Sequence, residues 1–323
     1  MNEFRLDTTV AIVIFNRPDT TARVLAEIAR AKPPRLLVIA DGPRADRPDE
    51  QAKCQATRAI IERVDWDCDV LTNYSEVNLG CKRRVSSGLD WAFQTVEQAI
   101  ILEDDCLPHP TFFRFCQELL EKYKDDERIT MVSGDNFQFG RKRTDYSYYF
   151  SHYCHVWGWA TWRRAWQYYD VDMKLWPSIR DGNWIRDVLK DDRAAVRWAK
   201  TFEVMHQGLV DTWDIQWVFA SWIQNGLAIL PNTNLISNIG FSPNATHTTS
   251  STSSLANLPT EAIEFPLLHP PFMVRDSQAD DITERSLFNA TFSSLLQRAL
   301  VKVQRTASQW KPLRRRKSSP SED

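Results

Sequence analysis

Three consecutive carboxylates, Glu103-Asp104-Asp105, directly follow an apolar run at residues 99–102. Like charges this close repel one another, and a hard divalent cation such as Mn²⁺ or Mg²⁺ relieves the repulsion through oxygen ligands. Side chains alternate along an extended chain, so Glu103 and Asp105 share one side and Asp104 takes the other. We expect Asp105 to bind the metal, and Asp104 to bind a ribose or, through water, the metal. The alternative is an acidic turn before a helix, where the helix dipole favours negative charge.

The other apolar runs of the first hundred residues are also followed by polar side chains, here Asn16, Arg17, Asp41, Asn78 and Arg84. At the carboxyl edge of a parallel sheet these side chains would face one crevice. Arginine is well suited to phosphate, so the set predicts a nucleoside diphosphate held together with a metal. The alternatives are an ordinary Asp-Gly-Pro turn at Asp41 and solvated surface positions for the arginines.

Two further titratable candidates lie in the second half. Asp214 stands among aromatic residues in the run Thr212–Trp217. Group transfer to a hydroxyl needs a base, and nearby indoles would desolvate this carboxylate and raise its pKa toward the working range. A helix N-cap is the alternative for Asp214. His247 lies in a polar loop from which it could reach the metal or a phosphate, and an ordinary loop histidine is the alternative.

Tryptophan is unusually frequent, with 13 in a chain of 323 residues. Large aromatic side chains dominate core packing, so pairs at helical spacing such as Trp213 and Trp217 are expected to be mostly core. We nominate Trp157, Gly158 and Trp159 as pocket lining, because glycine lets the backbone approach a ligand closely. Indole rings stack on the C–H faces of sugars, so an aromatic-rich half suits a carbohydrate.

Short apolar runs alternate with helical patterns from residue 8 to about 134. This alternation predicts an α/β fold with a mostly parallel sheet covered on both faces. We expect a ligand-binding half at 1–134, an aromatic-rich half of the same domain at 135–250, and an extension at 251–323. The extension shows helical spacing of apolar residues from about 284 to 305 and a basic cluster near its end.

Charge and composition exclude several classes. Forty Lys and Arg against 42 Asp and Glu give a net charge of -2, which argues against nucleic acid as a partner. The ten glycines form neither a G-x-G-x-x-G nor a P-loop pattern, so any phosphate must be held by side chains or metal. Six cysteines without C-x-x-C spacing, and no long apolar run, predict a reduced cytoplasmic protein.

With these residues assembled, the chain resembles glycosyltransferases of the GT-A fold, family 2-like, and in several segments the N-acetylglucosaminyltransferase I group. The strongest likeness is the segment 101–105, which ends in the carboxylate triplet and resembles a variant D-x-D motif, with the following Pro-Thr-Phe-Phe segment at 110–113. The pair Trp213-Asp214 resembles that group's Trp-Asp pair, and Trp157-Gly158-Trp159 resembles its Gly-Trp loop. Asn78-Leu79-Gly80 resembles the Asn-x-Gly of bacterial family 2 enzymes.

The resemblance implies roles for individual residues. Asp105 would coordinate Mn²⁺ or Mg²⁺, with His247 where a late histidine occurs in the group, and Asp214 would be the catalytic base. Arg17 would bind the nucleotide and Asp41 would recognise uracil.

We therefore expect a metal-dependent inverting glycosyltransferase that uses a nucleotide diphosphate sugar, UDP-linked by preference, and a hydroxyl acceptor on a carbohydrate or lipid carrier. The pathway would be surface polysaccharide or glycolipid synthesis. Residues 284–317 would give peripheral contact with the inner face of the membrane, or the helix would pack on the catalytic body. Two other functions stay open: a sugar-1-phosphate nucleotidyltransferase, although no glycine-rich loop follows the first strand, and a non-catalytic carbohydrate-binding or scaffold protein.

Overall fold

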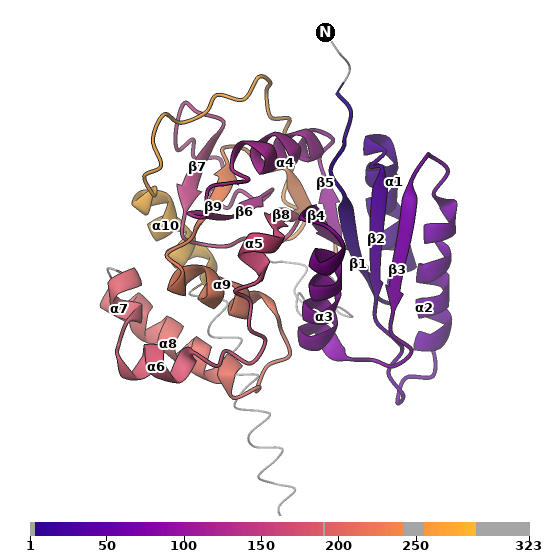
Figure 1. Cartoon of the computed structure of the whole chain (residues 1–323), viewed down its shortest axis with the longest axis horizontal. Coiled ribbons are helices and arrows are strands. Elements are labelled where there is room, and N and C mark those ends of the chain that lie inside the picture. The colour runs from indigo at the N-terminus through magenta and orange to yellow at the C-terminus, as the bar shows by residue number, and fades with distance from the viewer. Residues whose placement is uncertain (1–3, 190, 242–254, 289–323) are drawn as a thin grey trace, which may run out of the picture.

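The computed structural model describes residues 4–189, 191–241 and 255–288. The first half is a β/α succession in which each crossover helix packs beside the strands that it connects (Figure 1). Its strands are β1 (Val10–Ile14), β2 (Arg35–Ala40), β3 (Asp69–Tyr74) and β4 (Gln98–Glu103). Its helices are α1 (Pro18–Ala31), α2 (Glu50–Ala59) with the short η1 (Ile61–Arg63), and α3 (Gly80–Thr95). These four strands pair in parallel in the order β3-β2-β1-β4, which confirms the expected α/β organisation.

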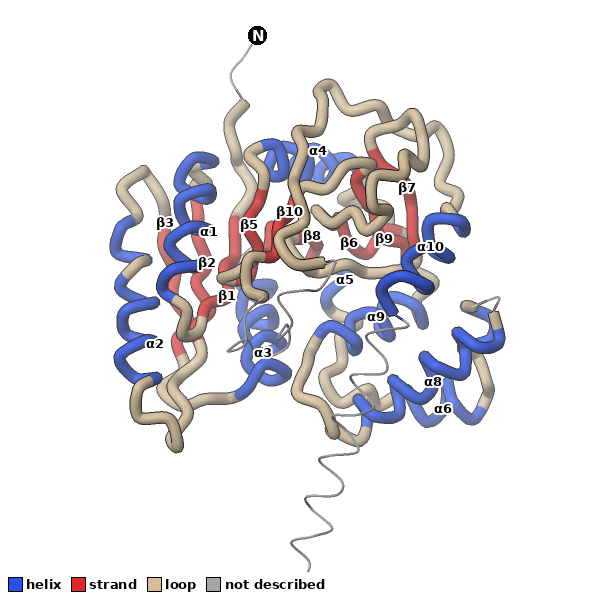
Figure 2. The backbone as a smooth tube through the Cα atoms, turned by 180° about the vertical axis from the view of Figure 1, so that it is seen from behind, coloured by secondary structure: helices blue, strands red, loops and turns tan. Residues whose placement is uncertain are grey.

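The second half continues the same sheet. After β5 (Cys106–Pro108), α4 (Thr111–Lys122) and β6 (Ile129–Ser133) come β7 (Tyr148–Ser151), β8 (Trp159–Trp162), β9 (Leu227–Pro231) and β10 (Ile236–Asn238). The complete order is β3-β2-β1-β4-β8-β6-β9-β7. Strand β8 lies between β4 and β6 and is antiparallel to both, an insertion that the regular alternation of the first half does not predict. Strands β5 and β10 form a separate antiparallel pair, which is seen in the view from behind (Figure 2).

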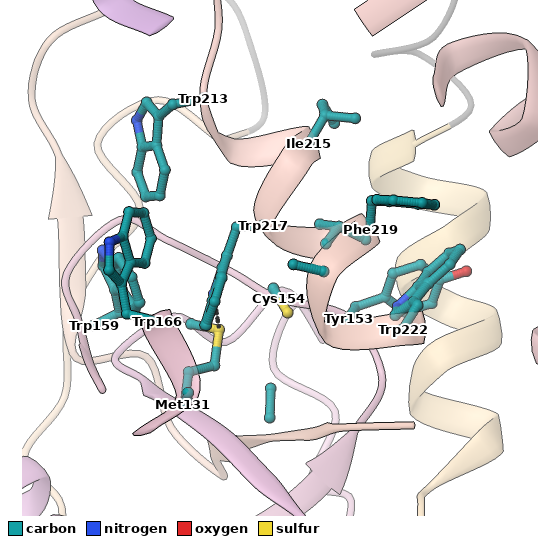
Figure 3. Packing of buried hydrophobic residues seen from close by; sticks show 14 of the residues in the cluster. Met131, Tyr153, Cys154, Trp159, Trp166, Trp213, Ile215, Trp217, Phe219 and Trp222 are labelled. Carbon is teal, nitrogen blue, oxygen red and sulfur yellow. Dashed lines mark hydrogen bonds between the residues drawn. The ribbon is translucent and has the colours of Figure 1, made fainter. Parts of the chain in front are cut away.

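Helices of the second half gather beside this sheet. They are α5 (Arg163–Trp166), α6 (Trp176–Asp181), α7 (Ile185–Val188), α8 (Asp192–His206) and α9 (Asp214–Ile223). The buried face of α9 carries tryptophans that pack on those of β8 and α5 (Figure 3). Trp159 and Trp213 stack with ring centroids 5.6 Å apart, and the Trp217 indole donates a hydrogen bond to Met131 Sδ at 3.4 Å. Most of the tryptophan excess therefore builds the core, as expected.

The last described segment, α10 (Ser277–Thr283) and η2 (Glu284–Phe288), is anchored in this core. Glu284 accepts hydrogen bonds from the Tyr153 hydroxyl at 2.7 Å and the Trp198 indole at 3.0 Å. The amphipathic stretch predicted from about 284 thus begins as a packed segment, and residues 289–323 lie outside the described part. No helix among the described residues is long and apolar enough to cross a bilayer.

Candidate functional site

The carboxylate triplet lies at the carboxyl end of β4, where it meets Arg17 from the turn after β1. Arg17 bridges two of the acids: Nη2 lies 2.9 Å from Asp104 Oδ1, and Nη1 lies 2.6 Å from Asp105 Oδ2. Asp104 Oδ2 also accepts a hydrogen bond from the Phe15 amide at 3.2 Å. The structure thus brings Arg17, Asp104 and Asp105 together, because adjacent parallel strands β1 and β4 end at the same edge.

Negative charge is concentrated in this cluster. Burial, followed by the charges of Asp105 and Asp104, raises the pKa of Glu103 to about 8. Burial also raises the pKa of Asp104 to about 6, although the Arg17 charge opposes the change. The triplet therefore resists full ionisation unless a cation binds beside it.

The residues after β10 cover the cluster. Asn238 lies opposite Cys106 in the β5–β10 pair, and the Ile239 amide donates to the Asp105 carbonyl at 2.8 Å. A Cβ on Gly240 would lie 1.9 Å from Asp105 Oδ2 and 2.6 Å from Arg17 Nη1. Only glycine allows the backbone to pass this close to the acid–guanidinium contact.

Asp41 lies at the end of β2, and neighbouring hydrogen-bond donors occupy all the acceptor positions of its carboxylate. Oδ1 accepts from the amides of Gly42 and Leu79, both at 2.9 Å. Oδ2 accepts from Asn78 Nδ2 at 2.9 Å and the Gly80 amide at 3.1 Å. A carboxylate has about four acceptor positions, so none is left for a base N–H. The predicted uracil contact does not fit this geometry; Asp41 and Asn78 instead hold the turn that starts α3.

Two other predicted ligand-binding residues are engaged elsewhere. Asn16 Nδ2 donates to Glu50 Oε1 at 3.2 Å, in a group that Arg44 completes. Arg84 is buried, and its Nη2 donates to the carbonyl oxygen of Asn73 at 2.9 Å. The prediction that Arg84 contacts phosphate does not fit this arrangement, because its guanidinium is buried and bonded to Asn73 near the end of β3.

Asp214 is the first residue of α9, and its carboxylate does not cap the helix. Within the described residues it accepts one hydrogen bond, from the Thr212 hydroxyl to Oδ1, so the N-cap alternative is wrong. Burial is the main cause of the raised pKa of Glu103, and the negative charge of Asp214 adds to it. Burial also raises the pKa of the Cys81 thiol in the first turn of α3, and the charges of Glu103 and Asp214 raise it further. The chain also brings Asp214 near the triplet, because Trp213, next to it, stacks on Trp159 of β8, which pairs with Ile101 of β4.

The Trp157-Gly158-Trp159 segment divides into a site-facing and a core part. Trp157 is partly exposed and makes edge contacts with Phe137 and Phe241, at centroid distances of 5.4 and 5.7 Å. Gly158 has φ +77°, and a Cβ there would lie 2.3 Å from Ile236. The prediction that Trp159 lines a pocket is wrong: its side chain is fully buried in the tryptophan cluster.

Sequence reasoning missed Asp135, which follows β6. Its Oδ2 accepts from the Trp157 amide at 3.0 Å, and burial raises its pKa well above the ordinary value. Its charge also reaches the Cys106 thiol beside Asp105. The signal was available, because Asp135 follows an apolar run just as the acidic triplet does.

The cluster offers carboxylate oxygens, which are the ligands that a hard divalent cation prefers, but few of them. Within the described part of the chain no three His, Cys, Asp or Glu side chains are grouped to hold a metal. One carboxylate is nevertheless enough when a bound diphosphate and water supply the remaining oxygens, as is common for Mg²⁺. The second predicted ligand, His247, lies outside the described residues. A cavity of about 750 Å³ lies between residues 139–147 and 258–268, and none of the predicted site residues lines it.

Comparison with models of protein families and with curated proteins finds no match for this chain.

Proposed function

We propose that the protein is a metal-dependent inverting glycosyltransferase of the GT-A type, family 2-like. It would move a sugar from a UDP-sugar to a hydroxyl on a carbohydrate or lipid-linked acceptor. The observation that carries the proposal is the position of Asp214: Trp213, the residue before it, stacks on Trp159 of β8, which pairs with Ile101 two residues before the triplet. A cation-binding acid cluster and a separate carboxylate base, joined at the carboxyl edge of one sheet, are the parts that this reaction needs.

The donor diphosphate would lie over the carboxyl ends of β1 and β4. Asp105, with His247, would hold Mn²⁺ or Mg²⁺, which when bound neutralises charge on the leaving diphosphate. Arg17 would bind a phosphate oxygen while it keeps its contact with Asp104. Glu103, the first residue of the triplet, would contact the donor beside Asp105 and Arg17. Trp157 and the turn at Gly158 would line the sugar side.

Asp214 would take the proton of the acceptor hydroxyl. The Thr212 hydroxyl occupies its Oδ1, which orients the carboxylate and leaves Oδ2 for the acceptor. The activated oxygen attacks the anomeric carbon from the face opposite the diphosphate, the C–O bond to the diphosphate breaks, and the configuration inverts. One base is sufficient for this single displacement.

The test is release of UDP from a panel of UDP-sugars by the purified full chain with Mn²⁺, compared with the same reaction in EDTA. Slow metal-dependent UDP release, enhanced by a sugar acceptor, is expected. Formation of pyrophosphate from UTP and a sugar 1-phosphate would instead identify a nucleotidyltransferase. Sugar binding without any nucleotide effect, seen in a thermal-shift screen, would overturn the proposal in favour of a binding module.

We also propose a cytoplasmic enzyme that contacts the inner face of the membrane close to a lipid-linked acceptor. Of the predicted stretch 284–317, Glu284 and Phe288 are buried in the core, so the contact would be made by residues 289–317. The basic residues after position 310 support this, because they complement anionic lipid headgroups.

A further inference from the structure

The start of α3 is a junction between the two halves of the protein. Four consecutive main-chain amides, of residues 79–82, have no partner within the helix and would otherwise need water. Asp41 accepts the first two, those of Leu79 and Gly80. Asp211, from the loop between α8 and α9, accepts the next two: Cys81 N lies 3.0 Å from Oδ2, and Lys82 N lies 2.8 Å from Oδ1.

Gly80 makes this contact possible. It has φ +77°, and a Cβ at this position would lie 2.6 Å from Asp211 Oδ2. Two separate features, a carboxylate on one element and a glycine on the other, therefore serve the same contact. The α3 dipole adds a favourable interaction with the negative charge of Asp211.

Asp211 is three residues before Asp214, and the chain between them is fixed. The Thr212 carbonyl accepts a hydrogen bond from Gln216 Nε2 at 2.9 Å, and the Trp213 carbonyl accepts one from the Tyr169 hydroxyl at 3.1 Å. Thr212 also donates to Asp214 itself. A displacement of Asp211 from α3 would thus be transmitted over a short, braced segment to the Asp214 carboxylate.

We infer that Asp211 is a positioning residue for Asp214, which it holds against the donor-binding half by joining the loop before α9 to the first turn of α3. The inference rests on the proposed function for the role of Asp214, but the contact itself does not. Asp211 and Gly80 thereby acquire a role that the proposed function does not assign to them, and the geometry of the Asp214 carboxylate depends on a contact between the two halves.

The experiment compares Asp211→Ala, Asp211→Asn and Gly80→Ala with Asp67→Ala, a control at an exposed aspartate before β3. Displacing a reacting group by about 1 Å can cost roughly 100-fold in rate, so kcat should fall about 10- to 100-fold in Asp211→Ala. KM for the UDP-sugar and the Kd for UDP should change less than about twofold, because no donor contact is lost. Asp211→Asn keeps one acceptor oxygen and should be intermediate.

The double variant Asp211→Ala with Gly80→Ala should lose less than the two single losses combined, because both disturb the same contact, while the positive φ of Gly80 adds a cost of its own. A purely structural role would instead lower the fraction of protein that binds UDP, or lower donor affinity and kcat together. An unchanged kcat in Asp211→Ala, or fully additive losses in the double variant, would overturn the inference.

Hydrogen exchange of the intact chain provides a readout that does not need activity. In Asp211→Ala the amides of Cys81 and Lys82 and the segment 209–217 should exchange faster, while the β1–β4 region stays protected. If the wild-type chain shows no transfer but this exchange pattern appears, the proposed function fails and the contact between the halves stands. Unchanged exchange at both places contradicts the contact and with it the positioning role.

Discussion

At the level of single residues, the proposal separates the acids by their partners. Asp104 and Asp105 are paired with Arg17, whereas Asp214 accepts only the Thr212 hydroxyl among the described residues. Asp214→Asn keeps the shape and that hydrogen bond but cannot accept a proton. Transfer should fall at least about 100-fold, the lower range for general acid–base catalysis, with UDP affinity unchanged. Initial rates and calorimetric UDP titration check this, and normal turnover would contradict the role of the base.

Arg17 shares Asp105 with any bound metal, which gives a prediction with two opposite signs. In Arg17→Ala the Asp105 carboxylate is released, so Mn²⁺ without nucleotide should bind more tightly, by roughly tenfold or about 1.4 kcal/mol. Affinity for UDP in saturating Mn²⁺ should fall, because a phosphate partner is lost. Isothermal titration of Mn²⁺ and then of UDP measures both. Weaker binding of Mn²⁺ alone would show that Arg17 does not compete for Asp105.

The sequence located some of these residues and misjudged others for one physical reason. Position after an apolar strand correctly predicts that Arg17, Asp104 and Asp105 meet at one edge, since strand direction alone decides it. The same rule cannot predict that main-chain amides occupy the acceptor positions of a carboxylate, as at Asp41, because those donors come from a loop more than 30 residues away. Asp211 was missed for the same reason, as its partners lie in α3.

At the level of elements, β10 and the residues after it form one wall of the site. Gly240→Ala should force the wall away from Asp105, since the added Cβ would lie 1.9 Å from Oδ2. We expect loss of metal-dependent UDP binding with the fold retained. Gly140→Ala is a control for the loss of a glycine as such, because the added carbon has no neighbour within 4 Å there; the φ of +79° at Gly140 adds backbone strain that Gly240 does not have. Equal UDP affinity in the two variants would argue against a wall at this position.

The elements of the first half were predictable because their strands are continuous apolar runs separated by amphipathic helices. The second half was not, because β7, β8 and β10 have only three or four residues each and pair with distant strands. Such short strands are defined by tertiary pairing rather than by local pattern. The antiparallel position of β8, and hence the burial of Trp159, follows from that pairing.

At the level of the whole molecule, α10 ties the chain after the sheet to the core through buried acids. Burial raises the pKa of Asp280 to about 7, although the Ser151 hydroxyl and Arg275 oppose the change. Asp276 also faces this carboxyl group, and burial lowers the pKa of neighbouring His152 to about 3, so that ring is neutral. The folded state therefore holds the Asp280 proton more tightly than the unfolded state does.

It follows that the contribution of Asp280 to stability falls as the pH rises from about 4 to 7. The side chain in Asp280→Asn cannot ionise. The melting temperature of this variant minus that of the wild type should therefore be larger at pH 8 than at pH 5. Thermal unfolding at both pH values measures this difference. The same difference in melting temperature at pH 5 and pH 8 would show that Asp280 is ionised throughout in the folded protein.

The same anchoring decides how the membrane proposal can be tested. Thr283, Glu284 and Phe288 are buried, so a chain cut before α10 would lose part of the core and should unfold. A chain ending at residue 288 keeps these contacts, and its melting temperature and UDP affinity should match those of the full chain. If residues 289–317 provide the membrane contact, co-sedimentation with anionic vesicles should be lost in this shortened chain and retained in the full one. Vesicles of neutral lipid serve as the control, because basic residues attract anionic headgroups specifically. Equal sedimentation of both chains with anionic vesicles would place the membrane contact elsewhere or exclude it.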